Sequence, residues 1–177
     1  MGTIIETLTA EAARGRSAEL ETLLTDAVRH GASVGLVEPL GADEAGAYWR
    51  KIIGDLAGGL RILLAAIDDE GRLVGSAQLA LETRANGRHR AEVQKVLVLA
   101  AARRRGIGAA LMTRIEAEAK VRGLRLLFLD TSEGRGGAVE FYRTLGYQFA
   151  GGIPDYAADP DGRLASNAIF YKLLAQA

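Results

Sequence analysis

The sequence predicts an α/β fold of the mixed α+β type, with six to seven strands and about four helices. Strand-like apolar segments alternate with amphipathic segments of helical period along the chain. Two of the strands follow each other across a short turn, which favours antiparallel pairing, whereas helices separate later strands. At 177 residues, without a linker or repeat, the chain is expected to form a single domain over residues 1–177.

Composition excludes several functional classes. Lys and Arg total 22 and Asp and Glu total 22, so no net charge attracts nucleic acid or an anionic membrane, and neither partner is expected. The chain has no Cys and two His, which excludes disulfides and thiolate nucleophiles and argues against a metal site. The N-terminus lacks a leader-peptide pattern, and no apolar run approaches the roughly 18 residues of a membrane span. We therefore expect a cytoplasmic protein.

The N-terminal part of the sequence predicts a strand and then helices. Residues 3–8 alternate apolar and polar side chains weakly, as an edge strand does, and Thr9 then offers helix-start chemistry. Apolar residues at helical spacing predict a helix over residues 17–30, with Gly31 as its C-terminal cap. A further helix is expected over residues 42–58, where paired glycines end it.

Three strands and a helix occupy the middle of the sequence. Residues 61–67 and 73–82 flank a polar turn at 68–71 that contains glycine, and this pattern predicts a hairpin. Residues 91–99 form the next predicted strand. This strand leads through a segment rich in arginine and glycine into a helix over residues 107–121.

The C-terminal third alternates strand and helix again. Residues 124–130 are nearly all apolar, which is typical of a buried central strand. A helix is expected over residues 138–145 with Gly146 as its cap, and closing strands over 147–150 and 167–173.

The segment Arg-Arg-Arg-Gly-Ile-Gly at residues 103–108 joins a predicted strand to a predicted helix. Free backbone N–H groups and the helix dipole at such a junction favour phosphate, and glycine allows close approach. A solvated charged face followed by a plain turn is the alternative. A dinucleotide fingerprint is excluded because Leu111 stands where a third glycine is needed. The residues expected to contact a cofactor here are Arg103, Arg104, Arg105, Gly106, Ile107, Gly108 and Ala109.

The context of this segment resembles the GNAT superfamily of N-acetyltransferases. That family shows V-x-x-L-x-V, then R/Q-x-x-G-x-G/A, then A-x-x-F-Y-x-x-L-G-Y/F, and residues 93–98, 103–108 and 138–147 follow this order. The resemblance covers the chain from near residue 3. It implies a central, mixed, mostly antiparallel, twisted sheet flanked by helices, and acetyl-CoA as the cofactor, with its pyrophosphate at the arginine and glycine segment.

Shorter runs at residues 31–35, 90–95 and 160–164 resemble a branch of the superfamily that acetylates a β-lactam toxin. Two positions depart from the family pattern. Ala100 stands where the family often has Pro, and Arg135 stands where many members have an Asn that contacts the pantetheine arm.

Acetyl transfer to an amine needs a group that removes a proton, because an alkyl ammonium with a pKa near ~10 is charged at neutral pH. Glu92 and Asp130 are the candidate general bases and also candidate acceptor contacts, since the resembled fold places these parts of its strands beside the acceptor cleft. The alternatives are an ion pair of Glu92 with Arg88 or Arg90, and a turn or helix-capping role for Asp130.

The resemblance assigns the proton for the departing thiolate to Tyr142, which is therefore both a catalytic and a cofactor-contacting candidate, whereas Phe141 beside it is expected to pack. A backbone N–H of Val96, Leu97 or Val98 is expected to polarise the thioester carbonyl, Leu97 above the others. The reason is that the family strand splays from its neighbour there and leaves donors unpaired.

The acceptor pocket is expected to include Ser33, Val34, Gln78 and Tyr156, because of their positions around the cleft in the resembled fold. Trp49 is expected to take part in the packing of its helix rather than to contact a ligand.

A small-molecule amine such as a toxin or antibiotic is the favoured acceptor, and a protein N-terminus or lysine is the alternative. A non-catalytic acyl-CoA-binding module is the rival from another class. A homodimer is a further possibility that the superfamily suggests.

Overall fold

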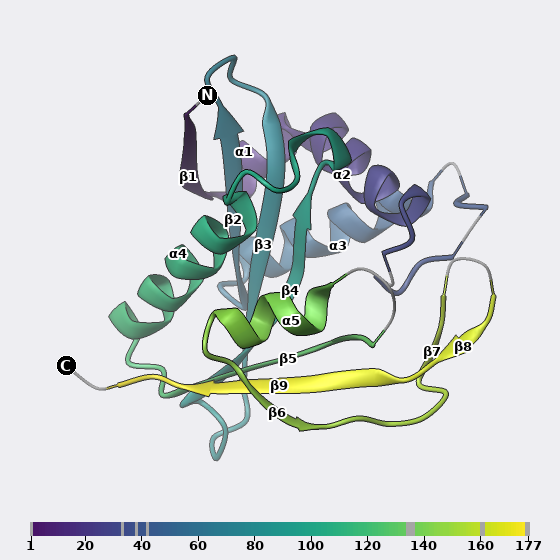
Figure 1. Ribbon diagram of the computed structural model, residues 1–177. Helices are drawn as coiled ribbons and strands as arrows, with labels where there is room; N and C mark the ends of the chain where they lie inside the picture. Colours follow the sequence, from purple (N-terminus) through teal and green to yellow (C-terminus); the bar gives the residue numbers. More distant parts are fainter. Residues whose placement is uncertain are drawn as a thin grey trace.

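A seven-stranded sheet forms the centre of the computed structural model, which describes residues 2–32, 34–37, 39–41, 43–133, 137–159 and 162–175. Over these residues the strand order is β1-β2-β3-β4-β5-β9-β6, and each neighbouring pair is antiparallel except β4 and β5 (Figure 1). The predicted mixed, mostly antiparallel sheet is therefore confirmed. The strands are β1 (Thr3–Leu8), β2 (Arg61–Asp68), β3 (Leu73–Leu81), β4 (Arg90–Val98), β5 (Leu126–Ser132), β6 (Gln148–Gly151) and β9 (Asn167–Leu173).

Helices cover both faces of the sheet. On one face lie α1 (Ala10–Gly15), α2 (Ser17–Arg29) and α3 (Glu44–Ala57), and on the other lie α4 (Ile107–Val121) and α5 (Ala138–Thr144) (Figure 1). Among the described residues this makes five α-helices, where about four were predicted. The additional one is the short α1, which begins at the N-cap Thr9 and is separated from α2 at Arg16.

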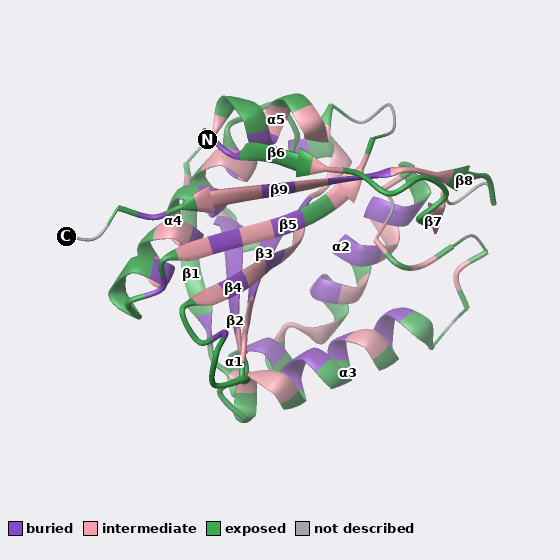
Figure 2. Cartoon of the chain, turned by 90° about the horizontal axis from the view of Figure 1, so that it is seen from below, coloured by how far each residue is buried: buried purple, intermediate pink, exposed green. Residues whose placement is uncertain are grey.

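The core consists of two layers because the central strands are buried on both sides (Figure 2). In β2, Ile62, Leu64 and Ala66 pack toward α4, whereas the alternate residues Leu63, Ala65 and Ile67 pack toward α1, α2 and α3. Strand side chains alternate between faces, so a strand buried on both faces needs the continuous apolar run seen here. Trp49 of α3 is 1% exposed in the second layer, which confirms its predicted packing role.

Two C-terminal features differ from the sequence prediction. Strand β5 runs from Leu126 to Ser132 rather than over 124–130, because the Leu124 N–H still bonds to the Ala119 carbonyl in the turn after α4. Asp130 therefore lies inside the strand, not at its end. The loop after β6 also holds a small hairpin, β7 (Ala157–Ala158) with β8 (Leu164–Ala165), whose two-residue strands are too short for a periodic signal.

No helix in the described part of the chain is long and apolar enough to cross a membrane.

Candidate active site

The sheet opens between β4 and β5. These parallel strands pair only through Arg90–Glu92 and Leu126–Phe128, and β4 then runs away from β5 (Figure 1). On its other edge β4 stays paired with β3, where a bulge between Ser76 and Gln78 shifts the register. Lys95 lies on the bulged stretch of β4 and has a positive φ of 48°. The predicted splay of this strand is therefore present in the structure.

Backbone donors of β4 face the gap. The Leu99 N–H donates to Val74 O at 2.9 Å, so it points toward β3. Successive N–H groups of a strand point to opposite edges, so the Val98 N–H faces the gap, while Leu97, opposite Ser76, faces β3. Within the predicted set, Val98 rather than Leu97 is the donor that this register directs toward a thioester.

The turn after β4 prepares the start of α4. Arg104 and Gly106 both have left-handed backbones, with φ of 62° and 81°. No side chain caps α4, and its first backbone bond runs from the Ala110 N–H to Gly106 O at 3.0 Å. The N–H groups of Ile107, Gly108 and Ala109 are the first donors of a helix and have no partner one turn earlier, as an anion site requires.

Side chains fix this turn against the sheet. Arg103 Nε donates to Val98 O at 3.2 Å, and the guanidinium groups of all three arginines lie on exposed residues. The Ala100 N–H donates to Asp26 Oδ2 of α2 at 2.8 Å. The proline common in the family at this position has no N–H, so the departure at Ala100 supplies a bond that proline cannot make. The other departure, Arg135, lies outside the described residues.

Gly108 has a packing role that the sequence prediction did not include. A Cβ on this residue would lie 3.2 Å from Cζ of Phe141 in α5, so the absent side chain lets the Phe141 ring reach α4. Phe141 packs against the core layer beneath α4, which confirms its predicted role. The contact ties together the two helices that border the gap.

Tyr142 of α5 is 8% exposed and lies among aromatic rings. Its ring centroid is 5.1 Å from that of Phe141, 5.9 Å from Tyr147 and 6.0 Å from Phe170. Burial, together with the negative charge of Asp130, raises the pKa of Tyr142 well above its ordinary value of 10.0. The phenol is therefore protonated throughout the neutral range, and it lies close enough to Asp130 to interact with it electrostatically.

Glu92 and Asp130 are on the same face of the sheet. Ala91 and Val93 pack into the layer beneath α4, so Glu92 between them points to the opposite face, and Asp130 follows Leu129 of the same layer in the same way. Arg90 donates to Glu82 at 3.1 Å and not to Glu92. Among the described residues neither carboxylate has a hydrogen-bond or ion-pair partner, so neither the predicted ion-pair alternative nor the capping alternative is realised there.

Lys95 lies near both carboxylates and interacts electrostatically with each of them. Its Nζ lies 5.6 Å from the ring centroid of Tyr48, on the face of the sheet that α3 covers. Burial lowers the pKa of Lys95, the charges of Asp130 and Glu92 raise it, and that of Arg61 lowers it. All three charged groups therefore lie near the Lys95 ammonium, and together with it they outline the proposed acceptor cleft.

A buried polar network forms the floor of this cleft. Arg61 donates through one nitrogen to Gln78 at 2.9 Å and to Gln94 at 2.6 Å, and its Nε is 3.4 Å from Asp55. Gln78 Nε2 donates to Tyr48 Oη at 3.0 Å. Burial raises the pKa of Tyr48 to about 12. Gln78 is fully buried with both ends of its amide engaged, so it positions Tyr48 and Arg61 rather than facing an acceptor.

Four residues of this cleft were not among the predicted site residues: Tyr48, Arg61, Gln94 and Lys95. Tyr48 and Arg61 occupy the polar margins of a helix and a strand that read as ordinary amphipathic elements. Gln94 and Lys95 stand inside the predicted strand of residues 91–99. The signal that was available is the Gln-Lys pair, which together with Glu92 interrupts the apolar residues of this strand.

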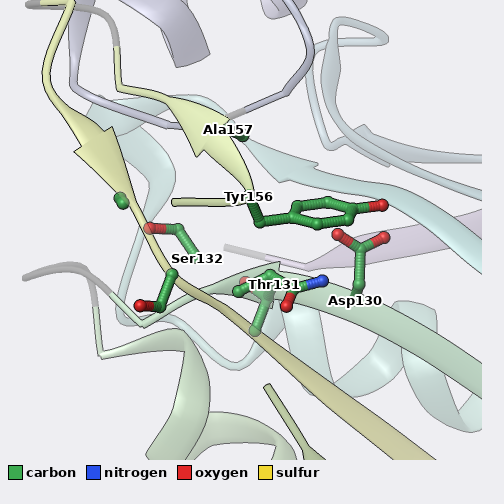
Figure 3. A pocket seen from close by; sticks show the side chains of 8 residues that line it. Asp130, Thr131, Ser132, Tyr156 and Ala157 are labelled. Atoms are coloured by element: carbon green, nitrogen blue, oxygen red, sulfur yellow. The ribbon is translucent and has the colours of Figure 1, made fainter. Parts of the chain in front are cut away.

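Tyr156 comes next to Asp130 from the loop before β7. The two residues line a small pocket with the end of β5, and Figure 3 shows the Tyr156 ring extending toward the Asp130 carboxylate. Tyr156 is 51% exposed, so its ring is accessible to a bound molecule. Val34 packs against the core layer of α1, α2 and α3 on the same face, whereas Ser33 lies outside the described residues.

Among the described residues, no three His, Asp or Glu side chains are grouped closely enough to share a metal ion.

A sheet that opens between two parallel strands, beside the uncapped start of a helix, suits an enzyme that binds a phosphate-bearing cofactor. The chain belongs to the acetyltransferase (GNAT) family, because residues 37–147 match that family.

Relatives of known structure share the whole fold. A ribosomal-protein-alanine N-acetyltransferase from Brucella melitensis is 22% identical with a TM-score of 0.79, covering 97% of this chain and 99% of that one. A phosphinothricin acetyltransferase from Sinorhizobium meliloti, in complex with acetyl-CoA, is 20% identical with a TM-score of 0.78, covering 99% and 90%. At these identities the likeness shows the fold alone.

A relative in sequence is described as an IAA acetyltransferase of Azospirillum brasilense. It is 33% identical over 90 residues, which make up 51% of this chain and 57% of that protein. The match thus spans little more than half of the relative's length.

Proposed function

We propose that this protein is an acetyl-CoA-dependent N-acetyltransferase that transfers the acetyl group directly to the amine of a small molecule, with Glu92 or Asp130 as general base. The observation that carries the proposal is the arrangement around the gap between β4 and β5. An anion site lies at one end of the gap, a protonated phenol beside it, and two carboxylates without partners among the described residues on the α3 face.

The residues at the gap fit acetyl-CoA. The uncapped N–H groups of α4 and the arginines before it suit the pyrophosphate, and the Val98 N–H suits an acyl carbonyl. When bound, acetyl-CoA supplies the acetyl thioester. Val96 and Leu97 belong to the same proposed contact surface along β4.

Each proton has a group on this chain. The carboxylate of Glu92 or Asp130 accepts a proton from the acceptor ammonium, and both carboxylates attract that ammonium before it is deprotonated. Tyr142 holds a proton at its hydroxyl oxygen, beside the gap, where a leaving group can take it. Because the chain has no Cys, no thiol competes as an acyl carrier.

A small-molecule acceptor is favoured by two lines of support. The relatives described as acting on IAA and on phosphinothricin carry small-molecule names. The runs at residues 31–35, 90–95 and 160–164 resemble the tabtoxin resistance protein, which modifies a β-lactam toxin. The relative described as a ribosomal-protein-alanine N-acetyltransferase makes a protein N-terminus the acceptor to compare.

The test is thiol release from acetyl-CoA across an amine panel that includes β-lactam amino acids and an alanine-terminated peptide. We expect release with a small amine, and a fall of about 10²-fold or more in kcat for Glu92→Gln or Asp130→Asn. Glu82→Gln is the control, because Glu82 is held by Arg84 and Arg90 away from the cleft. Full activity in both cleft variants would overturn the assignment of the base.

Direct transfer has its own readout. The intact mass of the protein after incubation with acetyl-CoA alone should remain unchanged, because no acetyl-enzyme forms. A stoichiometric acetylated protein that passes its acetyl group to the amine would contradict direct transfer.

A further inference from the structure

Among the described residues, Lys95 is a cation of the proposed acceptor cleft that forms no ion pair, although Glu92 and Asp130 lie near enough to influence its charge. Arg61 is engaged with Asp55, Gln78 and Gln94, so its charge and donors are occupied. Lys95, by contrast, has no carboxylate within 4.0 Å among the described residues. Its ammonium contacts the face of the Tyr48 ring, which donates no hydrogen bond and accepts none of ordinary strength.

The fold holds this ammonium in place. Lys95 is only partly exposed and lies on the bulge of β4 with a left-handed backbone, a conformation that is costly for a residue with a side chain. The bulge directs Lys95 to the face of the sheet that α3 covers, where the Lys95 ammonium packs on the Tyr48 ring. This lysine is held in place and donates no hydrogen bond among the described residues. Its ammonium is therefore available to bind an anion from outside the protein.

The anion does not come from the acetyl donor site. The arginine and glycine turn leads into α4, which packs on the opposite face of the sheet from α3. Lys95 instead shares its face with Glu92 and Asp130, whose charges both act on it. Negative and positive groups thus lie side by side where the amine binds.

We propose that Lys95 binds a carboxylate of the acceptor, so that the substrate is a small zwitterion carrying an amine and a carboxylate, as an amino acid does. The ammonium lies against Glu92 and Asp130, and the carboxylate lies against the Lys95 ammonium. Tyr156, which reaches over Asp130 from the β7 loop, covers the side chain of the acceptor (Figure 3). This inference rests on the proposed function and names the substrate class of the same cleft.

The test compares matched acceptors and matched variants. Thiol release is measured with an α-amino acid that the wild type accepts and with its primary carboxamide, which keeps the amine and removes the charge. The proteins are the wild type, Lys95→Gln, Lys95→Arg, and the control Lys51→Gln, which removes a lysine from the exposed face of α3. Thermal melting verifies that each variant is folded.

We expect kcat/KM for the acid to fall about tenfold to a hundredfold in Lys95→Gln, mainly through KM, while the value for the carboxamide changes less than about threefold. Lys95→Arg should retain most of the preference, and Lys51→Gln all of it. Because the acid-to-amide ratio is compared between proteins, differences in the intrinsic reactivity of the two amines cancel.

A purely structural lysine would give a different result. If Lys95 only reduces repulsion between Glu92 and Asp130, Lys95→Gln lowers activity on acid and amide equally, and the inference is overturned. It is also overturned if the wild type does not prefer the acid.

Calorimetric binding of the acid to the CoA-loaded protein separates this inference from the proposed function. Acid-selective binding that Lys95→Gln abolishes supports the inference even if no acceptor releases thiol, in which case the proposed function alone fails. Absence of acid-selective binding in a protein that does release thiol overturns the inference and leaves the proposed function standing.

Discussion

Removing the hydroxyl of Tyr142 tests whether this residue donates the proton that the leaving group takes. Phe keeps the ring that packs at 5.1 Å to 6.0 Å from three other aromatic rings. The hydroxyl has no hydrogen-bond partner among the described residues, so its loss leaves no buried group unpaired. Tyr142→Phe should therefore change the free energy of unfolding by less than about 1 kcal/mol.

Activity should respond very differently. If the Tyr142 hydroxyl donates the proton that the leaving group needs, its removal should lower kcat by about 10² to 10⁴-fold. KM for acetyl-CoA should change less than about threefold, because the anion site at α4 is intact. Activity is measured by thiol release, and stability by urea denaturation of the same preparations.

The pH profile adds a second condition. Burial and the charge of Asp130 raise the pKa of Tyr142 above its ordinary value of 10.0, so the phenol stays protonated across the neutral and mildly alkaline range. The wild-type profile of kcat/KM against pH should therefore show no alkaline loss below about pH 10 that disappears in Tyr142→Phe. Tyr147→Phe is the control, since Tyr147 belongs to the same aromatic cluster, and its kcat should stay within about threefold. Wild-type kcat in a folded Tyr142→Phe enzyme would refute this reasoning.

Four further substitutions have defined outcomes. Gly108→Ala brings a Cβ to 3.2 Å from the Phe141 ring and should lower the free energy of unfolding by about 1 to 3 kcal/mol. Gly54→Ala, which has open space around it in α3, should raise the free energy of unfolding by about 0.5 to 1 kcal/mol. Thermal melts compare the two variants with the wild type. Arg103→Ala should weaken CoA binding about tenfold, and this effect should be smaller at high salt. Titration of the protein with CoA measures the binding. Burial lowers the pKa of Lys95 below its ordinary value of 10.5. Just below pH 10.5 the unfolded chain therefore binds more protons than the folded chain, and the free energy of unfolding rises with pH. Urea denaturation should show that this rise is missing in Lys95→Gln.

Much of the fold follows from local patterns in the sequence. The glycine turn between β2 and β3 and the strands on either side are visible directly, and α4 has the predicted bounds of residues 107 to 121. These elements bury continuous apolar faces, so periodicity and propensity agree with tertiary packing. Strand β5 ends later than predicted because Thr131 and Ser132, which are polar, still pair with β9, and it begins later because Leu124 belongs to the turn after α4.

The proposed cofactor contacts were more predictable from the sequence than the proposed acceptor cleft. A strand, a glycine turn and a helix are contiguous, so their geometry can be inferred from residues 96 to 109. The acceptor cleft instead brings Tyr48 of α3, Arg61 of β2 and Lys95 of β4 onto one face. Their proximity depends on sheet order and on a bulge in β4, and neither is encoded in a local pattern.

Gln78 illustrates the limit at a single residue. Gln78 was expected beside the acceptor cleft, and it lies opposite Gln94 of β4, but no local pattern predicts its complete burial or its hydrogen bond to Tyr48 of α3. Burial with two engaged partners changes its role from contacting an acceptor to supporting Tyr48 and Arg61.

We have proposed that this protein moves an acetyl group from acetyl-CoA to the amine of a small acid. The most direct measurement is mass spectrometry of the reaction mixture with an amino acid panel, alongside the amount of CoA released. We expect an N-acetylated amino acid in an amount equal to the CoA, with the protein itself unmodified. Folded protein that binds CoA but yields no N-acetylated acid with any member of the panel would contradict it.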